Sequence, residues 1–253
     1  MKATRFWSGR QFEGGEMDLG LEGKSALVTG GSHGIGLAIA VALAEEGCGV
    51  HIAARDKYNL VKAVRSHFDI SSDIWTHSFD ALDPTSVDRL AKEILEAGGV
   101  DILINCVGGG GRWGSITVET PMESWDQVYQ KNARTAVQLT RSLLPMMLER
   151  DWGRVVTISS IHGREAGSNP WFMMAKAAEI ALMKGLAMEY LGSQWVTFNT
   201  VAPGFISIEG KDSAPSAGTP DDVAAAVAFL CSAQAKHING ACLVVDGGES
   251  KAF

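Results

Sequence analysis

This sequence is poor in cysteine, and no two of its cysteines are close enough to form a C-x-x-C motif. The four cysteines lie far apart, and three of them sit in or beside apolar runs. Isolated cysteines in such surroundings favour reduced, buried thiols, so we expect no disulfide, no metal site and a cytoplasmic location. The four are Cys48, Cys106, Cys231 and Cys242.

Long apolar runs and an excess of basic residues are also missing. No run reaches the ~18 apolar residues that a membrane-spanning helix needs, and no apolar segment typical of a secretion signal follows the basic N-terminal residues. With 22 Lys and Arg against 29 Asp and Glu, the net charge is −7. This argues against nucleic acid or an anionic membrane as the main partner. A phosphate-bearing small molecule remains compatible, because backbone amides and one or two cations can bind it within an acidic protein.

What the sequence does contain is a regular alternation of short apolar runs and helix-length segments from Lys24 onward. Most of the short runs are apolar on both faces, as in a parallel sheet covered by helices on both sides. Because no linker interrupts the pattern, we predict one three-layer, doubly wound α/β domain (a Rossmann fold) over residues 21–253. Residues 1–20 lack periodicity and are interpreted as a flexible N-terminal arm, with a subunit-contacting arm as the alternative. The expected strands are 25–30, 49–55, 75–79, 101–106, 153–159, 195–204 and 242–248, and the expected helices are 36–47, 57–68, 86–99, 125–150, 175–192 and 220–232.

A glycine-rich turn, Thr29–Gly36, follows the first expected strand directly and precedes the first helix. Glycine supplies the unusual dihedrals of such a turn, and the missing Cβ atoms leave room for a pyrophosphate at the helix N-terminus. In a β-α-β unit this G-x-x-x-G-x-G spacing predicts a dinucleotide site. The residues assigned to the cofactor here are Gly30, Ser32, His33, Gly34, Ile35 and Gly36.

The turn and four further motifs, in the same order, resemble the short-chain dehydrogenase/reductase family across about residues 24–248. The resemblance implies that Asp80-Ala81 contacts the adenine and that a Pro-Gly turn packs on the nicotinamide. The motif Asn105-Cys106-Val107-Gly108 stands where the family usually has N-N-A-G. The four motifs are Asp80-Ala81, Asn105-Cys106-Val107-Gly108, Val201–Ile206 and Asp246-Gly247-Gly248, from which Asn105, Gly108, Pro203, Gly204 and Ile206 are also assigned to the cofactor.

The choice between NADP(H) and NAD(H) depends on the end of the second expected strand. An acidic residue there would bond the ribose 2′-hydroxyl and repel a 2′-phosphate, but the chain has Ala54 followed by Arg55 and Asp56. A guanidinium can bind a phosphate through two parallel hydrogen bonds, and His33 stands where many NADP-dependent members carry a base. We therefore predict NADP(H). The alternative is that Arg55 only stacks on the adenine while Asp56 weakens a phosphate site.

The same resemblance implies four roles at the reacting carbonyl. A tyrosine exchanges a proton with the substrate oxygen, and a lysine four residues later lowers its pKa and holds the ribose. A serine bonds the carbonyl, and an asparagine maintains a water relay. Lys176, Ser160 and Asn132 match three of these roles. Phe172 occupies the tyrosine position, on the same helix face as Lys176.

A phenyl ring has no proton to donate, and losing a general acid typically lowers the rate by about 10²–10⁴-fold. We therefore expect severely reduced turnover with retained cofactor binding. Three explanations are open: an engineered Tyr→Phe variant, a natural member with another proton donor, or a non-catalytic cofactor-binding subunit. His162 is the nearest candidate donor, although a lone loop histidine is more often structural. The retention of Asn132, Ser160 and Lys176 favours the first explanation.

The substrate side is less well defined. Ile208–Pro220 is rich in Ser, Ala, Gly and Pro without an apolar period, which predicts a short flexible connection and an open pocket. Trp113 and Trp171 flank the expected site, either as aromatic walls or as packing residues. The helices around Asn132 and Lys176 match the family's subunit-contact helices, so we expect a homotetramer or a homodimer.

Overall fold

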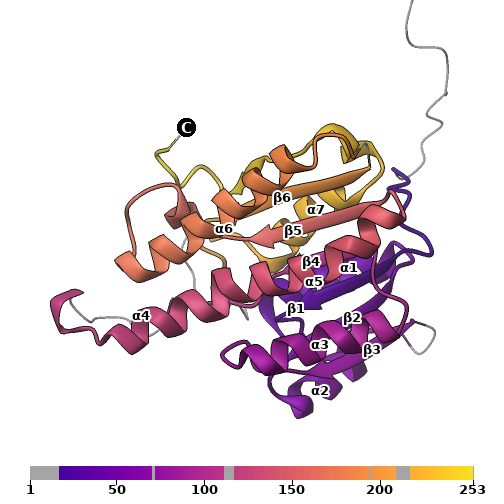
Figure 1. The fold of residues 1–253 in the computed structure, drawn as a ribbon, viewed down its shortest axis with the longest axis horizontal. Helices are drawn as coiled ribbons and strands as arrows, with labels where there is room; N and C mark the ends of the chain where they lie inside the picture. The colour runs from indigo at the N-terminus through magenta and orange to yellow at the C-terminus, as the bar shows by residue number, and fades with distance from the viewer. Residues whose placement is uncertain (1–16, 70–71, 111–116, 194, 209–216, 253) are drawn as a thin grey trace, which may run out of the picture.

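The computed structural model describes residues 17–69, 72–110, 117–193, 195–208 and 217–252. Seven parallel strands form one sheet in the order β3-β2-β1-β4-β5-β6-β7 (Figure 1). The doubly wound parallel sheet predicted from the sequence is therefore confirmed. The strands are β1 (Ser25–Thr29), β2 (Gly49–Ala54), β3 (Ile74–Ser78), β4 (Ile102–Asn105), β5 (Gly153–Ile158), β6 (Val196–Pro203) and β7 (Cys242–Val245).

Helices cover both faces of this sheet. Alternate residues of each strand point to opposite faces, so Val28 and Ile104 enter the core beneath α1 and α7, while Leu27 and Leu103 enter the core beneath α3, α5 and α6. The α-helices are α1 (Gly34–Glu45), α2 (Lys57–His67), α3 (Pro84–Glu96), α4 (Met122–Tyr129), α5 (Thr135–Glu149), α6 (Pro170–Glu189) and α7 (Pro220–Cys231). Shorter turns are η1 (Thr117–Glu119), η2 (Gln130–Arg134), η3 (Ile161–Gly163) and η4 (Gln234–His237).

The expected helix bounds are shifted by one to three residues in α1, α2, α3 and α7, and two other helices differ more. The helix expected over 125–150 consists of α4 and α5 joined by η2, a π-helical turn. The helix expected to begin at 175 begins at Pro170, where proline occupies the first turn and needs no amide partner. Both Phe172 and Lys176 therefore lie in regular helix.

Two segments that were expected to lack regular structure are described only in part. Of the expected arm, residues 1–16 lie outside the described residues, whereas the Leu19 carbonyl accepts a hydrogen bond from Ala233 N at 3.1 Å. Of the expected connection after Ile208, residues 209–216 lie outside the described residues. Its two ends are joined by an isolated bridge between Ile206 and Gly218. Within the described ranges, no helix is long and apolar enough to cross a membrane.

After β3 the chain crosses to the other side of β1, so the connections that follow β1 and β4 run in opposite directions along the sheet. This switch in direction opens a crevice at the carboxyl ends of β1 and β4. Thr29 closes the bottom of this crevice. Its Oγ1 donates to Ile104 O at 3.2 Å and accepts from the backbone N–H groups of Cys106 and Val107 at 3.0 and 3.2 Å. Ligand sites of open parallel sheets form at such a position.

Candidate functional site

A cavity of about 550 Å³ opens at this crevice, at the carboxyl ends of β1, β2, β4 and β5. Its size falls within the usual range for small-molecule sites. It joins the glycine turn at one end to the start of α6 at the other. Of the sequence-predicted residues, those lining it are Gly30, Ser32, His33, Gly34, Ile35, Gly36, Arg55, Asp80, Ala81, Gly108, Phe172 and Lys176.

The glycine turn fits a pyrophosphate in the way its spacing predicts. A Cβ on Gly36 would lie 2.4 Å from the carbonyl oxygen of Gly30, and a Cβ on Gly30 would lie 3.2 Å from the Val107 backbone. The N-cap residue of α1 is His33, whose side chain makes no capping hydrogen bond, and the first turn carries no acidic residue. The first amides of α1 are thus available to an anion in the cavity, with the helix dipole favouring negative charge there.

Cationic, imidazole and carboxylate side chains line the cavity beside the glycine turn, among them Arg55, His33 and Asp56. Arg55 is exposed there, and Ser32 Oγ lies 3.1 Å from His33 Nδ1. Asp56 also lines the cavity, and its carboxylate caps α2 by accepting from Tyr58 N at 2.8 Å and Asn59 N at 3.1 Å. The carboxylate after β2 therefore serves as a helix cap, while the side chain of Arg55 stands at the rim.

The Asp80–Ala81 corner forms another part of the cavity wall. Leu82 N donates to Asp80 Oδ1 at 2.9 Å, and the Ala81 carbonyl accepts from Thr135 Oγ1 at 3.1 Å. These bonds fix the corner against the start of α5. The structure thus brings the expected adenine-contacting pair into the same cavity as Arg55 and the glycine turn.

Asn105 and Asn132 lie behind the cavity and do not line it. Asn105 Nδ2 donates to Thr140 Oγ1 and Thr157 Oγ1 at 3.3 and 3.2 Å, which ties β4 to α5 and β5. Asn132, 1% exposed, accepts from Gly109 N at 3.1 Å and donates to Gly109 O at 3.1 Å and Val128 O at 2.7 Å. Asn132 therefore holds the loop after β4 against the π-helical turn that contains it.

Gly108 allows this loop to approach two of the predicted catalytic residues. A Cβ at this position would lie 2.4 Å from Asn132 Oδ1 and 3.1 Å from Lys176 Nζ. Any side chain at position 108 would therefore displace one of the two. Lys176 and Asn132 thus lie under the same short loop, on the nicotinamide side implied by the resemblance.

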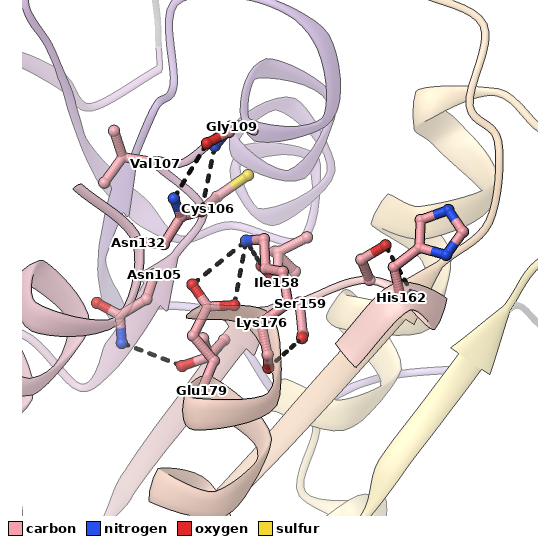
Figure 2. A network of polar contacts seen from close by, with 12 residues as sticks. Asn105, Cys106, Val107, Gly109, Asn132, Ile158, Ser159, His162, Lys176 and Glu179 are labelled. Carbon is pink, nitrogen blue, oxygen red and sulfur yellow. Dashed lines mark hydrogen bonds and ion pairs between the residues drawn. The ribbon is translucent and has the colours of Figure 1, made fainter. Parts of the chain in front are cut away.

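The ammonium group of Lys176 is buried and paired with a carboxylate. Lys176 Nζ donates to the Ile158 carbonyl at 2.9 Å and pairs with both carboxylate oxygens of Glu179, at 3.2 and 3.1 Å (Figure 2). Lys176 and Glu179 are 4% and 1% exposed. Burial raises the pKa of Glu179 to about 7, opposed by the charge of Lys176 and by the hydrogen bond from Lys176.

The two serines after β5 have different environments. Ser159 is buried, lines the cavity and donates from Oγ to the Lys176 carbonyl at 2.8 Å. Ser160, the predicted carbonyl-binding residue, caps η3 by accepting from His162 N at 3.2 Å, and it is not part of the cavity lining. The hydroxyl of Ser159 is thus used in the helix contact, while Ser160 Oγ still has its own proton to donate.

Phe172 lines the cavity at the place expected for a tyrosine. A Cβ on Gly110 would lie 3.4 Å from the Phe172 ring, and Lys176 Nζ lies 5.8 Å from the ring centroid. The neighbouring Trp171 is 2% exposed and packs edge-on against Trp125, with its Nε1 bonded to Gly110 O at 3.0 Å. Trp171 was expected to be either an aromatic wall of the site or a packing residue, and the structure supports the packing role. Trp113 lies outside the described residues.

His162, Pro203, Gly204 and Ile206 do not reach the cavity lining. The ring of His162 points away from Lys176 (Figure 2) and lies against Gly167, whose hypothetical Cβ would be 2.5 Å from it. Gly204 is packed against Glu249, which also accepts from Phe205 N at 2.7 Å.

Two charged residues of this site were missed from the sequence. Lys131 lines the cavity, and burial, followed by the charges of Arg55 and Lys176, lowers its pKa. Glu179 supports Lys176 from below. The available signals were the position of Lys131 next to Asn132 and the presence of an acid within the apolar helix segment AKAAEIAL.

Comparisons with known proteins find relatives over most of the chain. Residues 30–250 match the protein-family model described as enoyl-(acyl carrier protein) reductase. The chain is 33% identical over 247 residues to the 3-oxoacyl-(acyl-carrier-protein) reductase FabG of Vibrio cholerae, covering 91% of this chain and 98% of the relative. It is 32% identical over 250 residues to dehydrogenase/reductase SDR family member 4 of Bos taurus, covering 90% and 88%. The structure of L-sorbose reductase from Gluconobacter frateurii, complexed with NADPH and L-sorbose, matches with a TM-score of 0.85 at 30% identity, covering 94% of this chain and 100% of that one.

Proposed function

Since the chain belongs to the short-chain dehydrogenase/reductase family, we propose that it binds NADP(H) and transfers a hydride between the nicotinamide and a carbonyl or secondary alcohol. The observation that carries this proposal is a single cavity that contains both an uncapped helix N-terminus behind a glycine turn and Lys176. The helix N-terminus suits the pyrophosphate of a dinucleotide. Lys176 suits the nicotinamide end of the same cofactor.

The preference for NADP(H) is supported by the charge around the cavity mouth. Arg55 and His33 line the cavity near the end of β2, while Asp56 is occupied as the cap of α2. A 2′-phosphate would therefore meet a guanidinium there and a carboxylate that is already hydrogen-bonded. The sorbose reductase of similar structure was crystallised with NADPH.

The protein's own residues would bind and orient the reactants. When bound, the nicotinamide supplies or accepts the hydride. We assign Ser160 to hydrogen-bond the substrate oxygen, Lys176 to hold the ribose and Asn132 to hold the loop that covers Lys176. Asp80 and Ala81 would contact the adenine, and Pro203, Gly204 and Ile206 would border the nicotinamide. A ketone is the substrate group we propose, because the FabG relative and the sorbose reductase are named for a 3-oxoacyl group and for a ketose.

Phe172 is the residue at which this sequence departs from the proton donor that the family resemblance implies. Its ring lines the cavity and lies on the same side of α6 as Lys176, and it offers no proton. We therefore propose that turnover is strongly impaired while cofactor binding is retained.

We also propose self-association through α4, α5 and α6, as a homotetramer or homodimer. Apolar side chains are exposed on these helices, and such patches on a folded chain commonly mark an interface. They are Tyr129, Val137, Met174 and Met188, at 40%, 40%, 47% and 61% exposure. Light scattering coupled to size-exclusion chromatography would give the mass directly.

The proposal is tested by titrating the full-length protein with NADPH and with NADH, followed by intrinsic tryptophan fluorescence and calorimetry. We expect saturable binding of NADPH that is tighter than binding of NADH. Absence of binding of either coenzyme would overturn the proposed function. Binding without turnover on a ketone panel, even after tyrosine is introduced at position 172, would identify a non-catalytic cofactor-binding protein instead.

A further inference from the structure

Lys131, on the π-helical turn η2, is a cation of the cavity that has no role in the chemistry proposed above. Its side chain lines the cavity and is half-buried. Among the residues that the structure describes, its ammonium group forms neither an ion pair nor a hydrogen bond. A partly desolvated charge without a partner is unfavourable. The position therefore suits an anion that enters the cavity from outside the chain.

The other two cations that line the cavity each have a carboxylate close by. Lys176 Nζ pairs with Glu179 at 3.1 Å. Arg55 is followed directly in the chain by Asp56, which also lines the cavity. The charges that act on Lys131, by contrast, are those of Arg55 and Lys176, which are both positive. Within the described part of the chain, Lys131 is thus the lining cation whose charge no neighbouring carboxylate balances.

The ammonium group of Lys131 lies beside the loop that follows β4. A Cβ on Gly109 would lie 3.4 Å from Lys131 Nζ. Asn132, the next residue of η2, accepts from Gly109 N and donates to Gly109 O, both at 3.1 Å (Figure 2). These two hydrogen bonds fix the loop against η2, and so they fix the distance between the loop and the turn that carries Lys131.

Lys131 is within electrostatic reach of both ends of the proposed cofactor site. The charges of Arg55, assigned above to the 2′-phosphate, and of Lys176, assigned to the nicotinamide ribose, both act on it. In a dinucleotide, the group between those two ends is the diphosphate, which is negatively charged at neutral pH. A cation that both ends influence is therefore placed to meet the centre of the molecule.

We propose that Lys131 binds the diphosphate of the coenzyme and supplies a counter-charge that the glycine turn lacks. This inference rests on the proposed function, because it assumes a dinucleotide in the cavity. The turn Thr29–Gly36 offers backbone amides and the dipole of α1 but contains no lysine or arginine. A lysine binds a phosphate as a compact point charge. Since both coenzymes contain the diphosphate, Lys131 should strengthen the binding of NADPH and NADH alike, whereas Arg55 should distinguish between them.

The test is calorimetric titration of the full chain and of Lys131→Met with NADPH, NADH and ADP, which keeps a diphosphate but lacks the nicotinamide and its ribose. Lys131→Met removes the charge and keeps most of the side-chain length. It should weaken the binding of all three by a similar factor of about 10- to 100-fold, the usual range for a hydrogen bond to a charged group. Lys131→Arg should restore most of the affinity. Lys92→Met, at an exposed lysine of α3 outside the cavity lining, should bind as the native chain does.

Unchanged affinity of Lys131→Met for all three molecules would overturn the inference. A loss confined to NADPH would assign Lys131 to the 2′-phosphate, and a loss for both dinucleotides but not for ADP would assign it to the nicotinamide half, so either result would also overturn it. Thermal melting shows whether each variant is folded, and Lys131→Gln replaces Lys131→Met if the latter is not. Failure of the native chain to bind either coenzyme would instead reject the proposed function.

Discussion

The Nζ atom of Lys176 lies 5.8 Å from the centre of the Phe172 ring, one helical turn away on α6. The ring lines the cavity and the ammonium group lies below it. A hydroxyl added to this ring would stand in the field of the buried cation, which favours the phenolate and so lowers the pKa of a phenol. A tyrosine at position 172 would therefore be a stronger proton donor than a phenol in water.

Phe172→Tyr should raise turnover on ketone substrates by about 10²–10⁴-fold, the usual contribution of a general acid. The affinity for NADPH should hardly change, because the glycine turn and Arg55 are untouched. Phe229→Tyr, which adds the same hydroxyl on the far helix α7, is the matched control and should not change the rate. Steady-state oxidation of NADPH at 340 nm measures all three chains. An unchanged rate in Phe172→Tyr would show that the missing hydroxyl is not what limits the chemistry.

The fold could be predicted because its signals are local. Strands that are apolar on both faces, alternating with amphipathic segments, are compatible with few arrangements, and the turn Thr29–Gly36 marks the first β-α junction. The break at η2 could not be predicted in this way. It depends on Asn132, whose side chain bonds Val128 O one turn back and Gly109 from a distant loop. A periodicity argument contains no such long-range partner.

The candidate site was predictable where glycines and a helix N-terminus define it. A Cβ would collide with a neighbour at Gly36 and at Gly108, and Gly30 has a positive φ of 72°. Glu179 and Lys131 were not predictable, since their roles depend on which side of a helix faces the cavity and on partners elsewhere in the chain. For the same reason, the sequence locates the pair Ser159-Ser160 but does not predict their different contacts. Ser159 bonds α6, and Ser160 caps η3.

Gly36→Ala should weaken the binding of NADPH and lower stability. The new Cβ would lie 2.4 Å from the carbonyl oxygen of Gly30, so the turn or α1 must shift. Overpacking of this kind costs about 1–3 kcal/mol, and the displaced amides should weaken NADPH binding by at least about tenfold, or ~1.4 kcal/mol. Gly185→Ala in α6 is the control, because nothing lies within 4 Å of its hypothetical Cβ. Thermal melting and fluorescence titration should separate the two variants. Native-like binding by Gly36→Ala would argue against a pyrophosphate at this turn.

Arg55→Ala should reduce the preference for NADPH over NADH. A guanidinium–phosphate contact contributes about 1.5–3 kcal/mol, so the NADPH dissociation constant should rise by about 10- to 100-fold while that for NADH changes little. Arg65→Ala, an exposed arginine on α2 that does not line the cavity, should leave both constants unchanged. Parallel titrations with the two coenzymes decide the point. An equal loss for both would indicate that Arg55 stacks on the adenine instead of binding a phosphate.

Stability should fall in acid because of His51 on β2, at the other end of the sheet from α6. His51 is 6% exposed, stacks on Trp75 with ring centroids 4.7 Å apart, and its Nδ1 lies 2.9 Å from His77 Nε2. His77 Nδ1 in turn lies 3.0 Å from Glu93 Oε2. Burial, and secondarily the charge of His77, lowers the pKa of His51 from its ordinary 6.5 to about 4.

A histidine whose pKa is lower in the folded state stabilises the fold above its unfolded pKa, and this contribution is lost as the pH falls. Between pH 6.5 and about 4 the unfolded chain binds the extra proton, so the free energy of unfolding should decrease by as much as about 3 kcal/mol. His51→Gln removes the titrating ring and should flatten this decrease, whereas His237→Gln, at an exposed site, should leave it as in the native chain. Urea unfolding followed by circular dichroism from pH 7.5 to 4.5 measures the three curves. If His51→Gln lost stability in acid as steeply as the native chain, other groups would have to account for the loss.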